Sequence, residues 1–176
     1  MSSKLRYTDE KDKSYGLAGM AISMFVLDGE EYLNGMSIDA PVGEGVDLSQ
    51  DFYFIGNPRL SAKIAWNEIL KHFQLSAGMV ISNVMCRNYV QHRRKLNSEL
   101  VDALKAFVRE EAKENCSLDE DESDAIFEKS LNYFDRLFSY ARVHEIANDF
   151  ASAIVAQRSM TAQEILEQLR NLSMII

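Results

Sequence analysis

The residues whose types and spacing best suit chemistry form a basic run, RNYVQHRRK, from Arg87 to Lys95. Residues 69–98 hold five Lys and Arg side chains and no Asp or Glu, although the whole chain has a net charge of −8. Guanidinium, ammonium and imidazole groups gathered in this way suit a phosphate-bearing ligand. The candidate ligand-binding residues are Arg87, His92, Arg93, Arg94 and Lys95, together with His144.

A helix end explains the same charges without a ligand. If residues 79–95 form one helix, Arg93, Arg94 and Lys95 occupy its last turn, where each positive charge offsets the helix dipole by about 0.3–1 kcal/mol. The acidic residues 119–122 then lie in the first turn of a later helix, where negative charge is favoured. We favour this electrostatic interpretation over a phosphate site.

Nucleic-acid recognition through residues 87–95 is a further hypothesis. Residues 68–94 have the spacing of two helices joined by a short turn that contains Gly78, as in a helix-turn-helix motif. However, the residues that would face the bases begin with Met79, which is apolar and expected to be buried. The isoelectric point near 4.9 also argues against a phosphate-binding face. Nucleic acid is therefore an unlikely partner.

The histidines do not have the spacing of a metal site. Glu68 and His72 are four residues apart and share a helix face, but two ligands alone do not close a site. The chain contains neither Glu-x-x-His, which helical di-iron sites use, nor HExxH. We therefore predict no metal ligands and no cofactor.

Catalytic motifs are also missing from the sequence. GxSxG, the Walker loop and GxGxxG do not occur. Cys86 lies in an apolar stretch, where an inert packed thiol is expected, and the acids around Cys116 are expected to raise its thiol pKa. We assign no catalytic residue and expect a protein that is not an enzyme.

The elements that position these residues are predicted from the glycines and prolines. All eight glycines and both prolines fall at or before Gly78, so residues 79–176 are expected to form helices separated by polar caps. The predicted fold is all-α, an irregular bundle of about six helices with a less regular N-terminal third. We expect residues 1–13 to be a loose tail and residues 14–176 to form a single helical domain.

Capping residues predict where the helices begin. Asn57 precedes Pro58 and opens a helix over residues 59–74, followed by a turn at residues 76–78. Asn97 caps the next helix after residue 95. The spacing of Ser117 and Glu120, and of Thr161 and Glu164, is that of a capping box.

Residues 17–38 are open to two interpretations. GLAGMAISMFVL is typical of a helix, whereas Asp28-Gly29 and Asn34-Gly35 are strong hairpin-turn signals. A β-hairpin around Asn34-Gly35 is therefore the alternative in this region. Residues 39–56 are expected to form a long connection.

Composition indicates the compartment. The polar N-terminus resembles no secretion signal, no apolar run reaches the roughly 18 residues of a membrane span, and the two cysteines lie thirty positions apart. We expect a cytoplasmic protein that does not enter a membrane.

Three functions follow from these observations. The first is contact with a protein partner or a second copy of the chain, through the apolar C-terminal helix or the acidic residues 109–124. The second is binding or conversion of a small molecule in a helical bundle, with residues 39–56 over the pocket and Arg87, His92 or His144 as polar anchors. The third is regulation through nucleic acid.

Overall fold

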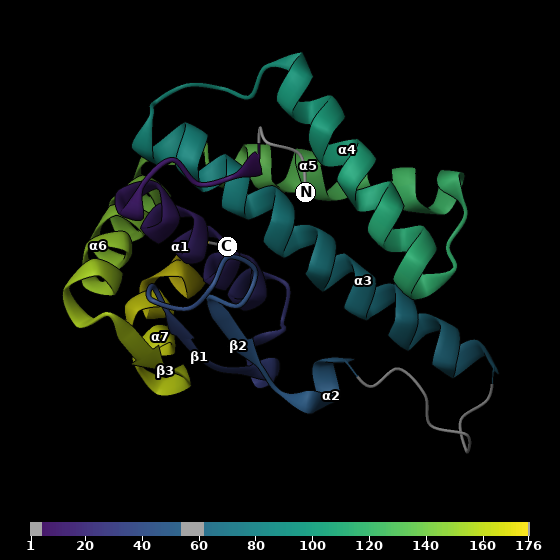
Figure 1. Ribbon diagram of the computed structural model, residues 1–176, viewed down its shortest axis with the longest axis horizontal. Helices are drawn as coiled ribbons and strands as arrows, with labels where there is room; N and C mark the ends of the chain where they lie inside the picture. The colour runs from purple at the N-terminus through teal and green to yellow at the C-terminus, as the bar shows by residue number, and fades with distance from the viewer. Residues whose placement is uncertain (1–4, 54–61, 176) are drawn as a thin grey trace.

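The computed structural model describes residues 5–53 and 62–175, which form seven α-helices and a small antiparallel sheet (Figure 1). The helices are α1 (Glu10–Val26), α2 (Gln50–Tyr53), α3 (Ala62–Met85), α4 (Ser98–Glu111), α5 (Glu120–Leu137), α6 (Ala141–Gln157) and α7 (Ala162–Leu169). The strands are β1 (Leu33–Ser37), β2 (Val46–Leu48) and β3 (Ser159–Thr161). The predicted mainly helical fold with a hairpin in its N-terminal part is confirmed.

Helix α1 is the centre of the molecule. It is buried almost all round from Tyr15 to Met24, as expected of a core helix that lacks a polar face, and it packs against α3 and α6. Asp9 caps its start by accepting a hydrogen bond of 2.7 Å from the backbone N–H of Asp12. The helical interpretation of residues 17–26 is therefore correct.

Small residues let α1 and α3 approach closely. A Cβ atom on Gly19 would lie 2.3 Å from the carbonyl oxygen of Ser82, so only glycine fits there. The Ser82 hydroxyl also donates a hydrogen bond of 2.7 Å to the Gly19 carbonyl. In Figure 1, α3 crosses the molecule diagonally, with α4 and α5 on one side and the sheet on the other.

The hairpin exists, but its turn is not at Asn34-Gly35. These residues lie inside β1, which pairs with β2 on one edge and β3 on the other. Gly35 is needed there because a Cβ atom would lie 2.7 Å from the Met160 carbonyl oxygen of β3. Residues 38–45 make the connection instead. The segment 39–56, predicted as a connection, contains β2 and α2, and its residues 54–56 lie outside the described residues.

The turn predicted at residues 76–78 is wrong. Helix α3 runs without interruption through Gly78 to Met85, and a π-helical segment, η3, continues it over Cys86–Gln91. A Cβ atom on Gly78 would lie 2.6 Å from a methyl group of Leu27, so this glycine serves helix packing and not a turn. The predicted cap at Asn57 and Pro58 lies outside the described residues.

The later caps are partly as predicted. The Asn97 side chain accepts from Leu100 N–H at 2.9 Å, and Thr161 with Glu164 forms a capping box. The box at Ser117 and Glu120 is wrong, because Asp119 with Glu122 forms it two residues later. Ser117 instead has a left-handed backbone and ends a second π-helical segment, η4 (Ala112–Cys116).

Both ends of the described chain pack on the core. Leu5 and Asp12 are buried, although residues 1–13 were expected to form a tail. Near the other end, Leu169 and Leu172 are fully buried, so the apolar C-terminal region docks on its own chain through α7 and the 3-10 segment η5 (Arg170–Met174). Within the residues that the structure describes, no helix combines the length and apolar character needed to cross a membrane.

Candidate functional site

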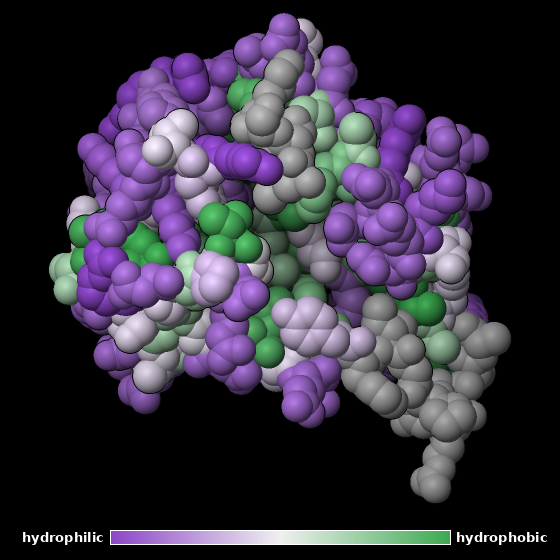
Figure 2. Space-filling view, viewed as in Figure 1, coloured by the Kyte–Doolittle hydropathy of each residue, from purple (hydrophilic) through white to green (hydrophobic). Residues whose placement is uncertain are grey.

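An apolar cleft of about 210 Å³ opens between α1, α3, α4 and the loop of residues 38–45. Figure 2 shows a hollow with an apolar floor near the middle of the face. The lining residues come from five separate segments, so only the tertiary fold assembles them. They are Leu5, Tyr7, Lys13, Leu17, Met20, Val42, Gly43, Gly45, Val80, Asn83, Val84 and Phe107.

The walls of the cleft are mainly aliphatic. Leu17 and Met20 come from α1, Val80 and Val84 lie one turn apart on α3, and Phe107 closes the side formed by α4. Helices α1 and α3 present these side chains because residues spaced by three or four share a helix face. No Asp or Glu lines the cleft.

The loop of residues 38–45 is fastened over α1. The Lys13 ammonium group donates hydrogen bonds to the Ile38 carbonyl, at 2.6 Å, and to the Ala40 carbonyl. Arg158 forms ion pairs with Asp39 of the loop and, at 2.9 Å, with Glu10 of α1. The loop therefore forms a fixed wall of the cleft.

In the part of the chain that the structure describes, three polar side chains reach the cleft, namely Tyr7, Lys13 and Asn83. The Asn83 amide donates a hydrogen bond of 2.6 Å to the Tyr7 hydroxyl. Burial raises the pKa of Tyr7, so its phenol stays protonated and keeps a proton to donate. The cleft thus combines apolar walls with a few polar groups, as small-molecule sites usually do.

Arg87, the first predicted binding residue, is buried beside the cleft and acts within the chain. Its guanidinium donates to both carboxylate oxygens of Asp12, at 2.8 and 2.6 Å. It also donates to the Leu5 and Arg6 carbonyls at 3.1 and 2.7 Å and lies 5.0 Å from the Tyr7 ring centre. Arg87 therefore holds the N-terminal segment that forms one wall of the cleft.

The carboxyl of Asp12 has a lowered pKa. Burial alone would raise this pKa, but hydrogen bonds from Arg87 and from the Thr8 backbone N–H outweigh it. The imidazole of His92 lies 3.8 Å from the same carboxylate. Two of the predicted binding residues, Arg87 and His92, therefore lie beside the Asp12 carboxylate.

The other basic residues point to separate partners. The Arg93 guanidinium lies 2.8 Å from Nδ1 of His144, whose Nε2 lies 2.6 Å from the Phe138 carbonyl oxygen. Because a carbonyl only accepts, Nε2 carries the imidazole proton and Nδ1 accepts from Arg93. Arg94 donates to the Asn88 side chain at 3.1 Å. Arg93, with a left-handed backbone, and Lys95 follow the end of the helix at Gln91 and do not occupy its last turn.

None of the six predicted binding residues lines the cleft, and their role as ligand-binding groups stays a prediction. The cleft residues Tyr7, Lys13 and Asn83 were not predicted. Of these three, only Asn83 gave a signal in the sequence, because it is a polar residue inside the apolar run MVISNVMC. Tyr7 and Lys13 carried no signal, because they fell in a polar stretch that was expected to be loose.

The cysteines have raised pKa values in the structure. Burial raises that of Cys86, and burial together with the charge of Glu111 raises that of Cys116. Across residues 5–53 and 62–175 there is no group of three or more His, Cys, Asp or Glu side chains placed to hold a metal ion. His72 instead packs against the rings of Tyr32 and Phe52, at 5.0 and 5.6 Å between ring centres.

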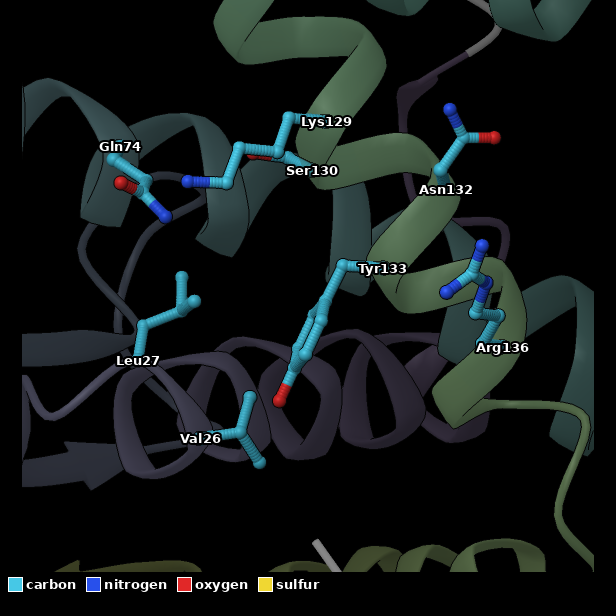
Figure 3. A pocket seen from close by; sticks show the side chains of 8 residues that line it. All are labelled: Val26, Leu27, Gln74, Lys129, Ser130, Asn132, Tyr133 and Arg136. Carbon is cyan, nitrogen blue, oxygen red and sulfur yellow. The ribbon is translucent and has the colours of Figure 1, made fainter.

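A second recess, of about 470 Å³, lies where the end of α1 meets α3 and α5 (Figure 3). The Tyr133 ring points from α5 toward Val26 of α1, while Asn132 and Arg136 turn away from it. Three of its lining side chains, Lys129, Asn132 and Arg136, are exposed. It is therefore a feature of the outer surface, and the apolar cleft is the better candidate for a site.

Comparison with known proteins leaves the cleft to be interpreted from its own geometry. No protein-family model, no curated protein and no solved structure matches this chain.

Proposed function

We propose that this protein binds a small, largely apolar molecule in the cleft between α1, α3, α4 and the loop of residues 38–45. The observation that supports this most directly is the wall of aliphatic side chains around about 210 Å³ of open space. A concave, mostly apolar space with a few polar groups is the usual form of a small-molecule site.

The volume sets the size of the ligand. About 210 Å³ equals the space of roughly seven water molecules at about 30 Å³ each. A ligand of that size binds weakly, with a dissociation constant on the order of millimolar. 1-Hexanol, which has seven non-hydrogen atoms, is therefore a suitable neutral probe.

The experiment measures 1-hexanol binding by saturation-transfer NMR and by ¹H–¹⁵N shift changes. Val80→Phe places a ring in the cleft and is expected to abolish binding. Val155→Phe makes the same change on the exposed side of α6 and serves as the control, with binding retained. Equal binding by the wild type and Val80→Phe would refute the proposal, as would a wild type that binds neither 1-hexanol nor a charged probe of similar size.

Self-association is a second proposed function, favoured by exposed apolar side chains at the start of α3. Ile64 is 48 % exposed and Trp66 is 37 % exposed, both within the first two turns of α3. Aromatic side chains such as Trp66 are enriched at protein–protein contacts. The two surfaces first predicted support this less, because Leu169 and Leu172 of the C-terminal region are buried, leaving Met174 exposed, and Asp124 of the acidic region pairs with Arg109.

Sedimentation analysis tests this second proposal. A dimer in the wild type that Trp66→Asp converts to a monomer would support it. Tyr140→Asp changes another exposed aromatic residue and is expected to leave the dimer intact. A wild-type monomer at high concentration would rule out self-association.

We also propose a cytoplasmic location, supported by two free cysteines, of which Cys86 is buried and Cys116 is half-buried.

A further inference from the structure

The polar groups of the cleft supply mainly hydrogen-bond donors. A lysine ammonium has three donors, and Lys13 uses two of them on the Ile38 and Ala40 carbonyls. Among the described residues, no acceptor within hydrogen-bond distance is recorded for the third. The Tyr7 hydroxyl accepts from Asn83 and so retains its own proton, and the Asn83 amide has a second N–H. The only acceptor that these side chains add is the Asn83 amide oxygen.

Among the described residues, Lys13 is also the only charged side chain that lines the cleft. Within the described part of the chain, no carboxylate lies within ion-pair distance of its ammonium group. Asp39 is close enough for Lys13 to lower its pKa, but the main cause of that lowering is the hydrogen bond from Arg158, and Asp39 does not line the cleft. From residues 5–53 and 62–175, the ligand therefore meets one positive charge and no negative charge.

We propose that the ligand is a small monocarboxylic acid, whose apolar tail of about five carbons fills the aliphatic part of the cleft. Its carboxylate accepts from Lys13, with Tyr7 and Asn83 as further donors. This inference rests on the proposed function, because it names the chemical class of the molecule that the same cleft binds.

Three six-carbon probes separate this inference from the proposed function. Hexanoate, 1-hexanol and hexylamine each contain six carbons, with a tail of five in hexanoate and six in the other two, and differ in the charge of the head group. Their affinities for the wild-type chain are measured by NMR titration. We expect hexanoate to bind roughly tenfold more tightly than 1-hexanol, since a hydrogen bond to a charged group is the stronger one. Hexylamine is expected to bind weakest, and acetate, which lacks the tail, not at all.

The outcomes are distinct. If 1-hexanol or hexylamine binds as tightly as hexanoate, the carboxylate inference is wrong and the proposed function stands. If acetate binds as tightly as hexanoate, the tail makes no contribution and the inference is also wrong. If none of the six-carbon probes binds, both the inference and the proposed function fail.

Variants test the role of Lys13. Lys13→Met keeps most of the side-chain length and removes the charge, so the ratio of hexanoate to 1-hexanol affinity is expected to fall to about one. Lys11→Met, on the exposed side of the same helix, is the control and keeps the ratio. Because Lys13→Met also loosens the loop, Tyr7→Phe provides a second test and is expected to lower the ratio several-fold. An unchanged ratio in both Lys13→Met and Tyr7→Phe would overturn the assignment.

Discussion

Two arginine–aspartate pairs in this protein have the same geometry and different surroundings. Arg87 binds Asp12 through two hydrogen bonds of 2.8 and 2.6 Å, and Arg109 binds Asp124 through two of 2.6 and 2.7 Å. The first pair is 8 % and 1 % exposed, whereas the second is 41 % and 26 % exposed. Geometry alone therefore does not tell how much each pair contributes to stability.

The surroundings decide the contribution. Breaking a buried pair leaves a charge that water cannot solvate, whereas exposed groups regain their hydration. The buried pair also joins three parts of the chain, since Arg87 contacts the Leu5 and Arg6 carbonyls as well as Asp12. The exposed pair joins only α4 to α5. Four experiments test this difference, from the largest expected effect to the smallest.

Arg87→Ala is expected to lower the free energy of unfolding by about 3–5 kcal/mol, because it leaves Asp12 buried without its main partner. Urea unfolding followed by circular dichroism measures the change. Arg142→Ala is the control, since Arg142 is 60 % exposed and pairs with Glu145 on the same helix. A loss as small as that of Arg142→Ala would show that the buried pair contributes no more to stability than an exposed pair.

Gly19→Ala tests how closely α1 and α3 must pack. Helix α1 carries Asp12, and the segment that continues α3 carries Arg87, so the position of the two helices sets the position of the buried pair. Its Cβ atom would lie 2.3 Å from a backbone oxygen, so we expect a loss of about 1–3 kcal/mol in the free energy of unfolding. Gly16→Ala meets mainly the Tyr7 and Asn83 side chains, at 2.5 and 2.8 Å, which can turn aside. The same urea experiment should show a smaller loss for Gly16→Ala. The opposite order would mean that the two helices are free to shift.

Asp12 is expected to make the free energy of unfolding depend on pH in acidic solution. Its pKa in the folded protein lies below the ordinary value of 3.8, so its contribution is complete above that value and is lost as the pH falls below it. The difference in stability between wild type and Asp12→Asn should be constant from neutral pH down to about 4 and then shrink. A difference that instead grew toward low pH would contradict the lowered pKa.

Asp124→Asn is expected to have the smallest effect. The pKa of Asp124 is also lowered, chiefly by the hydrogen bond from Arg109, but the pair is exposed to solvent and its charges are screened by salt. The stability difference from wild type should nearly vanish when salt is raised to about 0.5 M. In contrast, the loss in Arg87→Ala should persist at that salt concentration. If the stability losses of Asp124→Asn and Arg87→Ala depended equally on salt, burial would not distinguish the two pairs.

Much of the helical part of the fold was predictable, because it depends on local signals. The absence of Gly and Pro after residue 78 predicted helices, and the caps at Asn97 and Thr161 are set by neighbouring residues in the chain. The errors arose where a local signal served a distant contact. Gly78 and Gly35 look like turn residues, yet each makes room for a side chain or strand from elsewhere in the chain.

The candidate site was less predictable than the fold. The basic run attracted attention because its residues are neighbours in sequence, but Arg87, Arg93 and Arg94 bind three different partners inside the chain. The cleft residues Tyr7, Lys13 and Asn83 lie up to 76 positions apart. No spacing rule connects such residues before the chain is folded.

By itself, the sequence determined the helical class and several helix starts, because hydrophobic period and capping act over a few residues. Only the tertiary structure decided which charges are buried, where the hairpin turns and where an open cleft remains. The physical reason is that burial and close approach depend on which distant segments meet. The crossing of α1 and α3 at Gly19 brings those segments together and so places Lys13 and Asn83 around one space.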